Sequence, residues 1–269
     1  MTLDEIPLAG ATAAKPPMLD YIIAKLPRFP FDKFTQASNM LGTQMKATGE
    51  IMGIGSNLSE CLLKSVRSLE NGAHHFNHPK FDGMKKEALI EYISEFHDDN
   101  LFAIAEAFWL GANIDEVHKV TGITPFFLEA FKQITDAEKK IESNKFDLDT
   151  LIEAKKLGFC DKYIAKLWNI TEREVFDYRK KNNVFPIYKM VDTSHAGAYI
   201  PYFYSSYTGE NQSRLGDKKK IIVLGAGPIR IGQGVEFDYS TVHAVTTIKK
   251  SGYEAIIINN NPETVSTDY

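Results

Sequence analysis

The sequence predicts a mainly α protein, in which a central helical segment is flanked by two incomplete α/β pieces. Three observations lead to this prediction. Residues 72–212 read as helical and carry an internal duplication, whereas the preceding residues hold only two strand-like runs and one helix. Residues 213–269 read as strand, glycine-rich loop, helix and strand, which is the opening of a doubly wound sheet. We therefore predict three domains, over residues 1–71, 72–212 and 213–269.

The first piece is predicted to hold two strands, over residues 20–26 and 50–54. The first strand is expected to stop at Pro27, because proline cannot donate to a ladder of backbone hydrogen bonds. Phenylalanines follow it in a cluster that is typical of a protein core.

A helix is predicted after the second strand, with Asn57 or Ser56 as its N-cap. Its Lys64 and Arg67 are expected to face outward, opposite an apolar inner face. That inner face consists of Leu58, Cys61, Leu62, Val66 and Leu69. Two strands and one helix do not close a core, so we expect this piece to be the end of a larger domain that begins upstream.

The helical segment carries a duplication in which residues 107–111 recur 47 positions later, as residues 154–158. Thr124 corresponds in the same way to Thr171, and each threonine is predicted to N-cap the helix that follows it. Repeats that pair helices usually bury a shared core. We expect both tryptophans of the chain to belong to that core.

The second copy also resembles a helix-turn-helix, the fold of many DNA-binding modules, over residues 164–175. The candidate recognition helix carries Glu172, Glu174 and Asp177, whose charges a phosphate backbone would repel. A formal net charge of −4 also gives no reason to expect a nucleic-acid partner. A DNA-binding module therefore stays an alternative, with a helical hairpin that only packs as the plainer interpretation.

The third piece is centred on a glycine-rich loop that contains Gly225, Gly227 and Gly232. A dinucleotide-binding fingerprint lacks its third glycine, because Arg230 stands there, and asparagines at 259–261 replace the acid that holds the ribose. A Walker loop fails because Gln-Gly follows the last glycine where Lys-Ser/Thr is required. An NAD-binding Rossmann enzyme is therefore a second, disfavoured alternative.

Other classes of site receive little support from the sequence. His74, His75 and His78 lie in a predicted loop, without the orienting partners that metal ligands usually have. Cys61 and Cys160 are isolated, so a reducing cytosol is the expected compartment. No apolar run approaches the ~20 residues of a membrane span. We predict a cytoplasmic protein with neither a membrane nor a nucleic acid as partner.

Several motifs resemble the large subunit of carbamoyl-phosphate synthase. They lie at residues 25–29, 43–46, 49–55, 188–193, 225–239 and 260–269. The resemblance covers essentially the whole chain. It implies that the first piece is the C-terminal part of the first ATP-grasp domain and the helical segment is the oligomerisation domain. The third piece would be the start of the second pre-ATP-grasp domain, so we expect an internal segment of a longer protein.

The resemblance implies an ATP-dependent carbon–nitrogen ligase. This family makes carbamoyl phosphate from bicarbonate, ammonia and two ATP, for pyrimidine or arginine biosynthesis, and a glutaminase small subunit supplies the ammonia. In the family, the residues that bind ATP and Mg²⁺ or Mn²⁺ lie outside the region that this chain resembles. We therefore expect no catalytic, cofactor-binding or metal-binding residue here and no activity from the segment alone. The expected partners are the glutaminase subunit and, through the helical domain, a second copy of the protein.

By the same resemblance, Arg230, Gly234 and Glu236 line an internal tunnel that passes carbamate to the second active site. Physical chemistry agrees with this assignment, because glycine lets backbones approach closely and a guanidinium suits a carboxylate-like anion. Alternatively, Arg230 and Glu236 pair with each other and only brace the turn.

Overall fold

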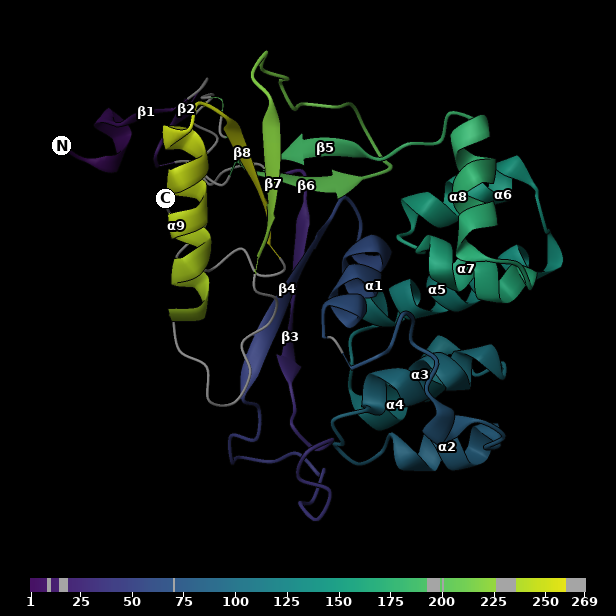
Figure 1. Ribbon diagram of the computed structural model, residues 1–269. Helices are drawn as coiled ribbons and strands as arrows, with labels where there is room; N and C mark the ends of the chain where they lie inside the picture. Colours follow the sequence, from purple (N-terminus) through teal and green to yellow (C-terminus); the bar gives the residue numbers. More distant parts are fainter. Residues whose placement is uncertain are drawn as a thin grey trace.

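The computed structural model describes residues 1–8, 11–14, 19–69, 71–192, 199, 201–225 and 236–259. Helices, the short 3-10 helices included, occupy about 44% of the described residues, and each sheet among these residues pairs two strands. The protein is therefore mainly α, as predicted. A body of helices lies on one side of the molecule and the small sheets lie on the other (Figure 1).

Three of the sheets are antiparallel hairpins and one is a parallel pair. The strands are β1 (Pro7–Leu8), β2 (Ala11–Thr12), β3 (Ile22–Arg28), β4 (Gly49–Gly55), β5 (Ile187–Met190), β6 (Phe203–Ser206), β7 (Lys220–Leu224) and β8 (Glu254–Ile258). The strands form four separate pairs, β1 with β2, β3 with β4, β5 with β6 and β7 with β8.

Most of the helices lie between β4 and β5. The α-helices are α1 (Leu58–Ser68), α2 (Lys86–Tyr92), α3 (Asn100–Trp109), α4 (Ile114–Thr121), α5 (Pro125–Ser143), α6 (Leu148–Lys156), α7 (Asp161–Trp168), α8 (Glu172–Lys181) and α9 (Glu236–Lys250). Two short 3-10 helices are η1 (Leu3–Glu5) and η2 (Pro79–Phe81).

The hairpin β3–β4 runs in register from the pair Ile22–Gly55 to the pair Arg28–Gly49. Pro27 lies inside β3, opposite Glu50, so the prediction that this strand stops at the proline is wrong. The reason is that, within the described residues, β3 pairs with β4 alone, and a strand at a sheet edge tolerates a residue that cannot donate.

Helix α1 packs on both strands of this hairpin and on α5. Asn57 is its N-cap, and the Asn57 side chain accepts a hydrogen bond from the Glu60 amide at 2.8 Å. Asn57 is one of the two residues that the sequence offered for this cap. The prediction that Lys64 and Arg67 face outward is wrong. Lys64 Nζ donates to the Ile54 carbonyl at 2.9 Å, and Arg67 donates to a carbonyl of the α6–α7 turn. Neighbouring elements therefore cover α1 on both sides.

The backbone repeats with the spacing that the sequence predicts, so α3–α4–α5 corresponds to α6–α7–α8. Gly111 and Gly158 follow the first helix of each copy with φ of +89° and +95°, in the left-handed region that favours glycine. Gly122 and Asn169 end the second helix of each copy with φ of 70° and 50°. The duplication is thus a repeat of structure as well as of sequence.

The two predicted threonine caps have different outcomes. The side chain of Thr171 accepts from the Glu174 amide, and Glu174 reaches back to the Thr171 amide at 2.8 Å, which forms a complete capping box. Thr124 occupies the N-cap position of α5, but its side chain makes no capping hydrogen bond. Pro125 at the first position of α5 already supplies a suitable backbone angle for the start of this helix.

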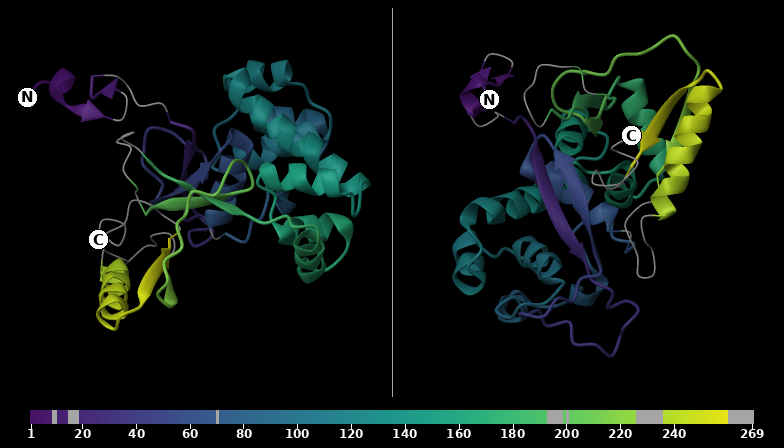
Figure 2. Two further views of the ribbon diagram at one scale, coloured as in Figure 1. Left: turned by 90° about the horizontal axis from the view of Figure 1, so that it is seen from above. Right: turned by 90° about the vertical axis from the view of Figure 1, so that its left-hand side faces the viewer.

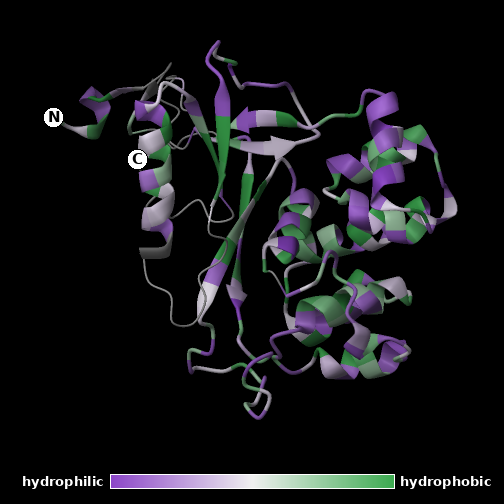
Figure 3. Ribbon diagram, in the orientation of Figure 1, coloured by the Kyte–Doolittle hydropathy of each residue, from purple (hydrophilic) through white to green (hydrophobic). Residues whose placement is uncertain are grey.

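One hydrophobic core joins α1 to both copies of the repeat. Its largest fully buried side chains include Trp168, Phe76, Phe81, Phe108 and Phe159. Hydrophobic and hydrophilic residues alternate along these helices (Figure 3). Their buried apolar residues make up this core. Trp168 was expected in the core and is 2% exposed, whereas Trp109 is only half-buried.

The hairpin β5–β6 packs against the strands that precede α1. Tyr204 lies edge-on to Tyr21, with ring centroids 6.3 Å apart, and Val191 completes this second small core. Lys189 forms an ion pair with Asp20 at 2.7 Å. The tyrosine-rich stretch is therefore a connector that contacts the first piece. The unit β7–α9–β8 lies on the far side of β3–β4 from the helical body (Figures 1 and 2).

Candidate functional site

The predicted glycine-rich loop leaves the carboxyl end of β7. Strand β7 runs parallel to β8, in register from the pair Lys220–Glu254 to the pair Leu224–Ile258. The Gly225 amide donates to the Ile258 carbonyl at 2.8 Å, which extends the pairing by one residue. Both strands therefore end at the same edge, where open α/β sheets place their ligands.

Gly225 lies close to Asn259. A Cβ atom at Gly225 would lie 1.8 Å from Asn259 Oδ1 and 3.0 Å from the Ile258 carbonyl oxygen, so the Asn259 side chain would have to move and the backbone contact would be tight. The neutral amide of Asn259 thus stands beside the loop, at the position where a dinucleotide-binding enzyme would carry its ribose-binding acid.

Helix α9 begins at Glu236 and packs on β7 and β8. Its first turns bury Asp238, Thr241 and Val242. An acidic residue at this place is favoured by the positive end of the helix dipole. The start of α9 lies at the same end of the unit as the carboxyl ends of both strands (Figure 1).

Most of the predicted loop and tunnel residues lie outside the described part of the chain. They are Gly227, Arg230, Gly232 and Gly234. Glu236 is placed as the first residue of α9, without a description of its side chain. The structure therefore positions Gly225 and the two ends of the loop, while the tunnel lining stays a prediction.

Two family models match the chain. The first describes the oligomerisation domain of the carbamoyl-phosphate synthetase large chain and matches residues 50–183. The second describes the carbamoyl-phosphate synthase preATP-grasp domain and matches residues 217–269. The chain belongs to the carbamoyl-phosphate synthase large-chain family. The oligomerisation match spans α1 to α8, including the segment that resembles a helix-turn-helix, and the preATP-grasp match spans the glycine-rich loop.

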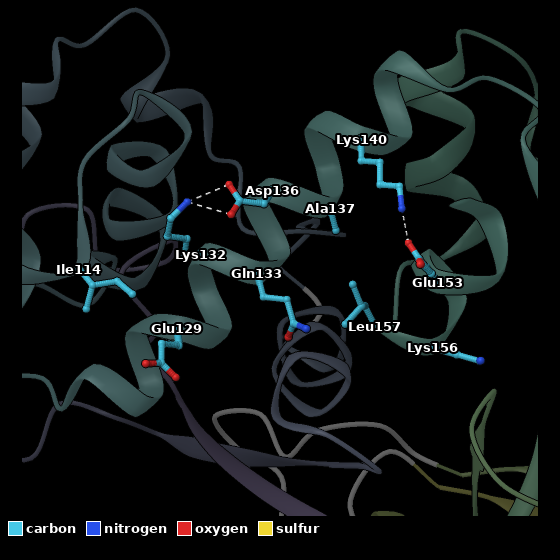
Figure 4. A pocket seen from close by; sticks show the side chains of 10 residues that line it. All are labelled: Ile114, Glu129, Lys132, Gln133, Asp136, Ala137, Lys140, Glu153, Lys156 and Leu157. Atoms are coloured by element: carbon cyan, nitrogen blue, oxygen red, sulfur yellow. Dashed lines mark hydrogen bonds and ion pairs between the residues drawn. The ribbon is translucent and has the colours of Figure 1, made fainter. Parts of the chain in front are cut away.

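The outer face of α5 in this large chain carries a shallow groove of about 680 Å³ (Figure 4). Acidic and basic side chains alternate along it. Lys132 forms an ion pair with Asp136 at 2.8 Å, and Lys140 forms one with Glu153 of α6. These side chains are about half exposed, so the groove presents a row of both charges to the solvent.

Of the three histidines weighed as metal ligands, His75 is a core residue. Its ring stacks on Tyr163, and its Nδ1 lies 3.7 Å from Oε2 of Glu138, which accepts a hydrogen bond from the Tyr163 hydroxyl. Burial lowers the pKa of His75 to about 3 and raises the pKa of Glu138 to about 7. Nδ1 of His78 accepts from the Lys80 amide at 3.2 Å. Among the described residues, no group of three or more metal-ligating side chains is gathered.

Sequence reasoning missed a polar junction within the second copy of the repeat, where α6, α7 and α8 meet. Asp161 accepts hydrogen bonds from Lys155 and Arg179, both at 2.7 Å. The signal is visible when the two copies are aligned, because Lys155 and Asp161 replace the apolar Phe108 and Ile114 of the first copy. Charged residues at repeat positions that are otherwise apolar indicate a local role beyond core packing.

No helix within the described ranges is both long enough and apolar enough to span a membrane.

Proposed function

We propose that this chain links the two catalytic halves of a carbamoyl-phosphate synthase large subunit and carries its self-association surface. The observation that carries the proposal is the match of the oligomerisation domain to residues 50–183, which correspond to one continuous core from α1 to α8. The match of a preATP-grasp domain to the following residues on the same chain supports the linking role.

The parent enzyme, in this proposal, makes carbamoyl phosphate from bicarbonate, ammonia and two ATP, for pyrimidine or arginine biosynthesis. A glutaminase small subunit delivers the ammonia. The ATP and the Mg²⁺ or Mn²⁺ ions bind elsewhere in the subunit, because phosphoryl transfer needs positioned cations and metal ions that the family resemblance places outside these residues. The 269-residue chain alone is then inactive in an assay for carbamoyl phosphate. Product formation by the isolated chain would contradict this.

The self-association surface is proposed to be the groove on α5, with a second copy of the chain as its occupant. In a twofold dimer, each copy contributes the same surface patch to the interface. Each positively charged residue of the patch must therefore meet a negatively charged residue of the second copy. The alternation of Glu129, Lys132, Asp136 and Lys140 along one helix meets this requirement when two α5 helices lie antiparallel. Charge complementarity thus supports a homodimer through this face.

Sedimentation velocity over a range of concentrations tests this surface. We expect the wild-type chain to form a dimer and the Lys132→Glu/Lys140→Glu variant to remain monomeric at the same concentrations. Exposed ion pairs contribute only about 1 kcal/mol or less to stability, so the variant should fold normally. Arg173→Glu on α8, at a 77% exposed side chain, is the matched control and should still dimerise. A wild-type monomer, or a dimer that survives the double reversal, would overturn the assignment.

The carbamate tunnel is proposed to be lined by Arg230, Gly234 and Glu236 in the complete enzyme. A bulky Gly234→Phe side chain would then block the passage while both active sites stay intact. We expect bicarbonate-dependent ATP hydrolysis to continue and carbamoyl phosphate formation to fall, with free ammonia as the nitrogen source. Using ammonia removes any effect on the glutaminase subunit. An unchanged ratio of product to ATP consumed would exclude the tunnel role.

A further inference from the structure

A second cavity, of about 210 Å³, lies where α1, the α6–α7 turn and the β6 region meet. It is separate from the groove on α5 and from the glycine-rich loop. The side chains that matter for its chemistry are Arg67 and Lys64 from α1, Lys155, Cys160 and Asp161 from the second repeat, and Tyr207 after β6. Three segments far apart in sequence thus enclose one polar space.

The carboxylates next to this cavity are already occupied by partners. Glu60 forms an ion pair with Lys64 at 2.8 Å and accepts hydrogen bonds from the Ser56 amide and the Ser206 hydroxyl. Asp161 is shared between Lys155 and Arg179.

Positive charge therefore exceeds negative charge around the cavity. Lys64, Arg67 and Lys155 line the cavity beside the carboxylates of Glu60 and Asp161, and Arg179 pairs with Asp161 from behind the lining. The third acid that lines the cavity, Glu172, is exposed at its rim, where water screens it. The interior thus has a net positive field.

Arg67 has the fewest partners of these cations. Its guanidinium donates to the Gly158 carbonyl at 2.8 Å, and this is its single acceptor within the described part of the chain, where no carboxylate lies within 4.0 Å. Burial lowers the pKa of Arg67. A guanidinium has five N–H donors. Arg67 is half-buried, so the donors that do not bond to Gly158 are open to a ligand that enters the cavity.

The first turn of α7 adds further donors at the same place. Helix α7 begins at Asp161, and its N-cap residue Cys160 lines the cavity without making a side-chain cap. The first amides of a helix have no intrahelical acceptor and point toward the N-cap. The amides of Tyr163 and Ile164 donate to the Cys160 carbonyl, so the amides of Asp161 and Lys162 remain for an anion beside Cys160.

The first copy of the repeat provides an internal comparison. Its equivalents of Lys155 and Asp161 are the apolar Phe108 and Ile114, whereas the equivalent of Arg179 is the charged Lys132. Phe108 is 2% exposed and packs in the core. The repeat backbone therefore packs without a Lys155–Asp161 pair, so the repeat itself does not require this pair.

We propose that this cavity binds a small oxyanion, held by the guanidinium of Arg67 and the N-terminal amides of α7 and balanced by Lys155. The ligand class is a phosphate or carboxylate group of small size, because the cavity is small and its unused groups are donors. This inference does not depend on the proposed tunnel or on the dimer surface.

The two cysteines of the chain allow a direct test of binding. Cys160 lines the cavity, whereas Cys61 is fully buried and burial raises its thiol pKa to about 11. N-ethylmaleimide should therefore label Cys160 first. If a bound anion keeps the reagent out of the cavity, the labelling rate falls by a factor of (1 + anion concentration/Kd). At an anion concentration of three times Kd, the rate is then about fourfold lower.

The test compares the labelling rate of Cys160 in sodium phosphate with that in sodium chloride of equal ionic strength. We expect phosphate to slow the reaction saturably and chloride to have no such effect. Bicarbonate serves as a carboxylate-like alternative. Saturable protection by either oxyanion supports the site and shows which group it prefers. Equal rates in phosphate, bicarbonate and chloride would overturn the proposal without any variant.

Two variants then locate the binding group. Arg67→Gln should abolish the protection, whereas Arg173→Gln, at an exposed arginine of α8, should leave it unchanged. Circular dichroism establishes that both variants are folded. If Arg67→Gln does not fold, Arg67→Lys replaces it, and we expect weaker protection because lysine loses the planar fork of donors. Full protection in a folded Arg67 variant would contradict the assignment.

Discussion

The imidazole of His75 lies flat against the phenol ring of Tyr163, with ring centroids 4.2 Å apart and ring planes 3° from parallel. The hydroxyl of the same tyrosine donates to Glu138, which also lies near the histidine. A neutral imidazole suits this apolar stack, and burial keeps His75 neutral by lowering its pKa to about 3. The packing of these three side chains in the core therefore shifts the pKa values of both His75 and Glu138.

The stability of the protein should depend on pH through this cluster. The folded pKa of His75, about 3, lies below its ordinary value of 6.5, so His75 makes stability rise with pH between these values. The folded pKa of Glu138, about 7, lies above its ordinary value of 4.5, so Glu138 makes stability fall as pH rises between these values. Between pH 4.5 and pH 6.5 both groups titrate, and their contributions to stability oppose each other. In the Glu138→Gln variant, stability should therefore rise with pH over this range because of His75 alone.

Urea denaturation at about pH 5 and pH 6 measures this difference. For each protein, the change in unfolding free energy from pH 5 to pH 6 is measured. This change should be more positive for Glu138→Gln than for wild type, by about 1.4 kcal/mol. The glutamine still accepts a hydrogen bond from Tyr163, so the packing is retained. Parallel pH profiles for the two proteins would show that Glu138 does not titrate in this range.

The two equivalent glycines of the repeat should respond differently to alanine. A Cβ at Gly158 would lie 2.8 Å from the Glu60 Cα, whereas nothing lies within 4 Å of a Cβ at Gly111. Both have positive φ, so Gly111→Ala should cost about 1 to 2 kcal/mol of unfolding free energy for the backbone alone. Gly158→Ala should cost about 3 kcal/mol or more, because α1 must also shift. Equal losses in urea denaturation would show that the α1 contact is not tight.

Asp161 should be essential to the polar junction. Although burial alone raises it, Lys155 and Arg179 hold the pKa of Asp161 below 3.8, so its stabilising contribution is present above that pH and is lost as pH falls. Asp161→Asn leaves two buried cations without their carboxylate and should cost about 3 to 5 kcal/mol at neutral pH. Asp177→Asn, which breaks an exposed pair on α8, is the control and should cost below about 1 kcal/mol. Thermal unfolding of both variants distinguishes these outcomes.

The capping threonines provide a second matched pair. Thr171→Ala removes a complete capping box and should lower the unfolding free energy by about 1 kcal/mol. Thr124→Ala removes a side chain without a capping bond and should change it by less than about 0.5 kcal/mol. Both threonines are exposed, so differences in burial do not confuse the comparison. A loss at Thr124 as large as that at Thr171 would contradict the description of the two caps.

Periodicity and turn chemistry in the sequence were enough to predict the fold class, the repeat and a cap at Asn57 or Ser56, of which the structure shows Asn57. These features depend on local interactions within a few residues, which a single sequence records directly. The predicted end of β3 at Pro27 is wrong because it depends on how many neighbours the strand has. That number is a property of the tertiary structure.

The polar residues of α1 show the same limit for the candidate sites. The apolar face of α1 is predicted correctly, yet Lys64 and Arg67 are only half-exposed and donate to backbone carbonyls of segments far along the chain. A helical pattern identifies one buried face and cannot show that a second surface covers the other face. The resemblance of the motifs, in contrast, identified the family because it rests on particular residues in the loops and not on periodicity.

Helix α1 is packed on the hairpin β3–β4 with one face and shares the hydrophobic core of the repeat with another. A rotation of the hairpin must therefore turn the whole helical body with it, since no hinge separates them at this helix. In an assembly joined through α5, a change in the angle between two subunits would be transmitted mechanically to the strands on which α1 rests.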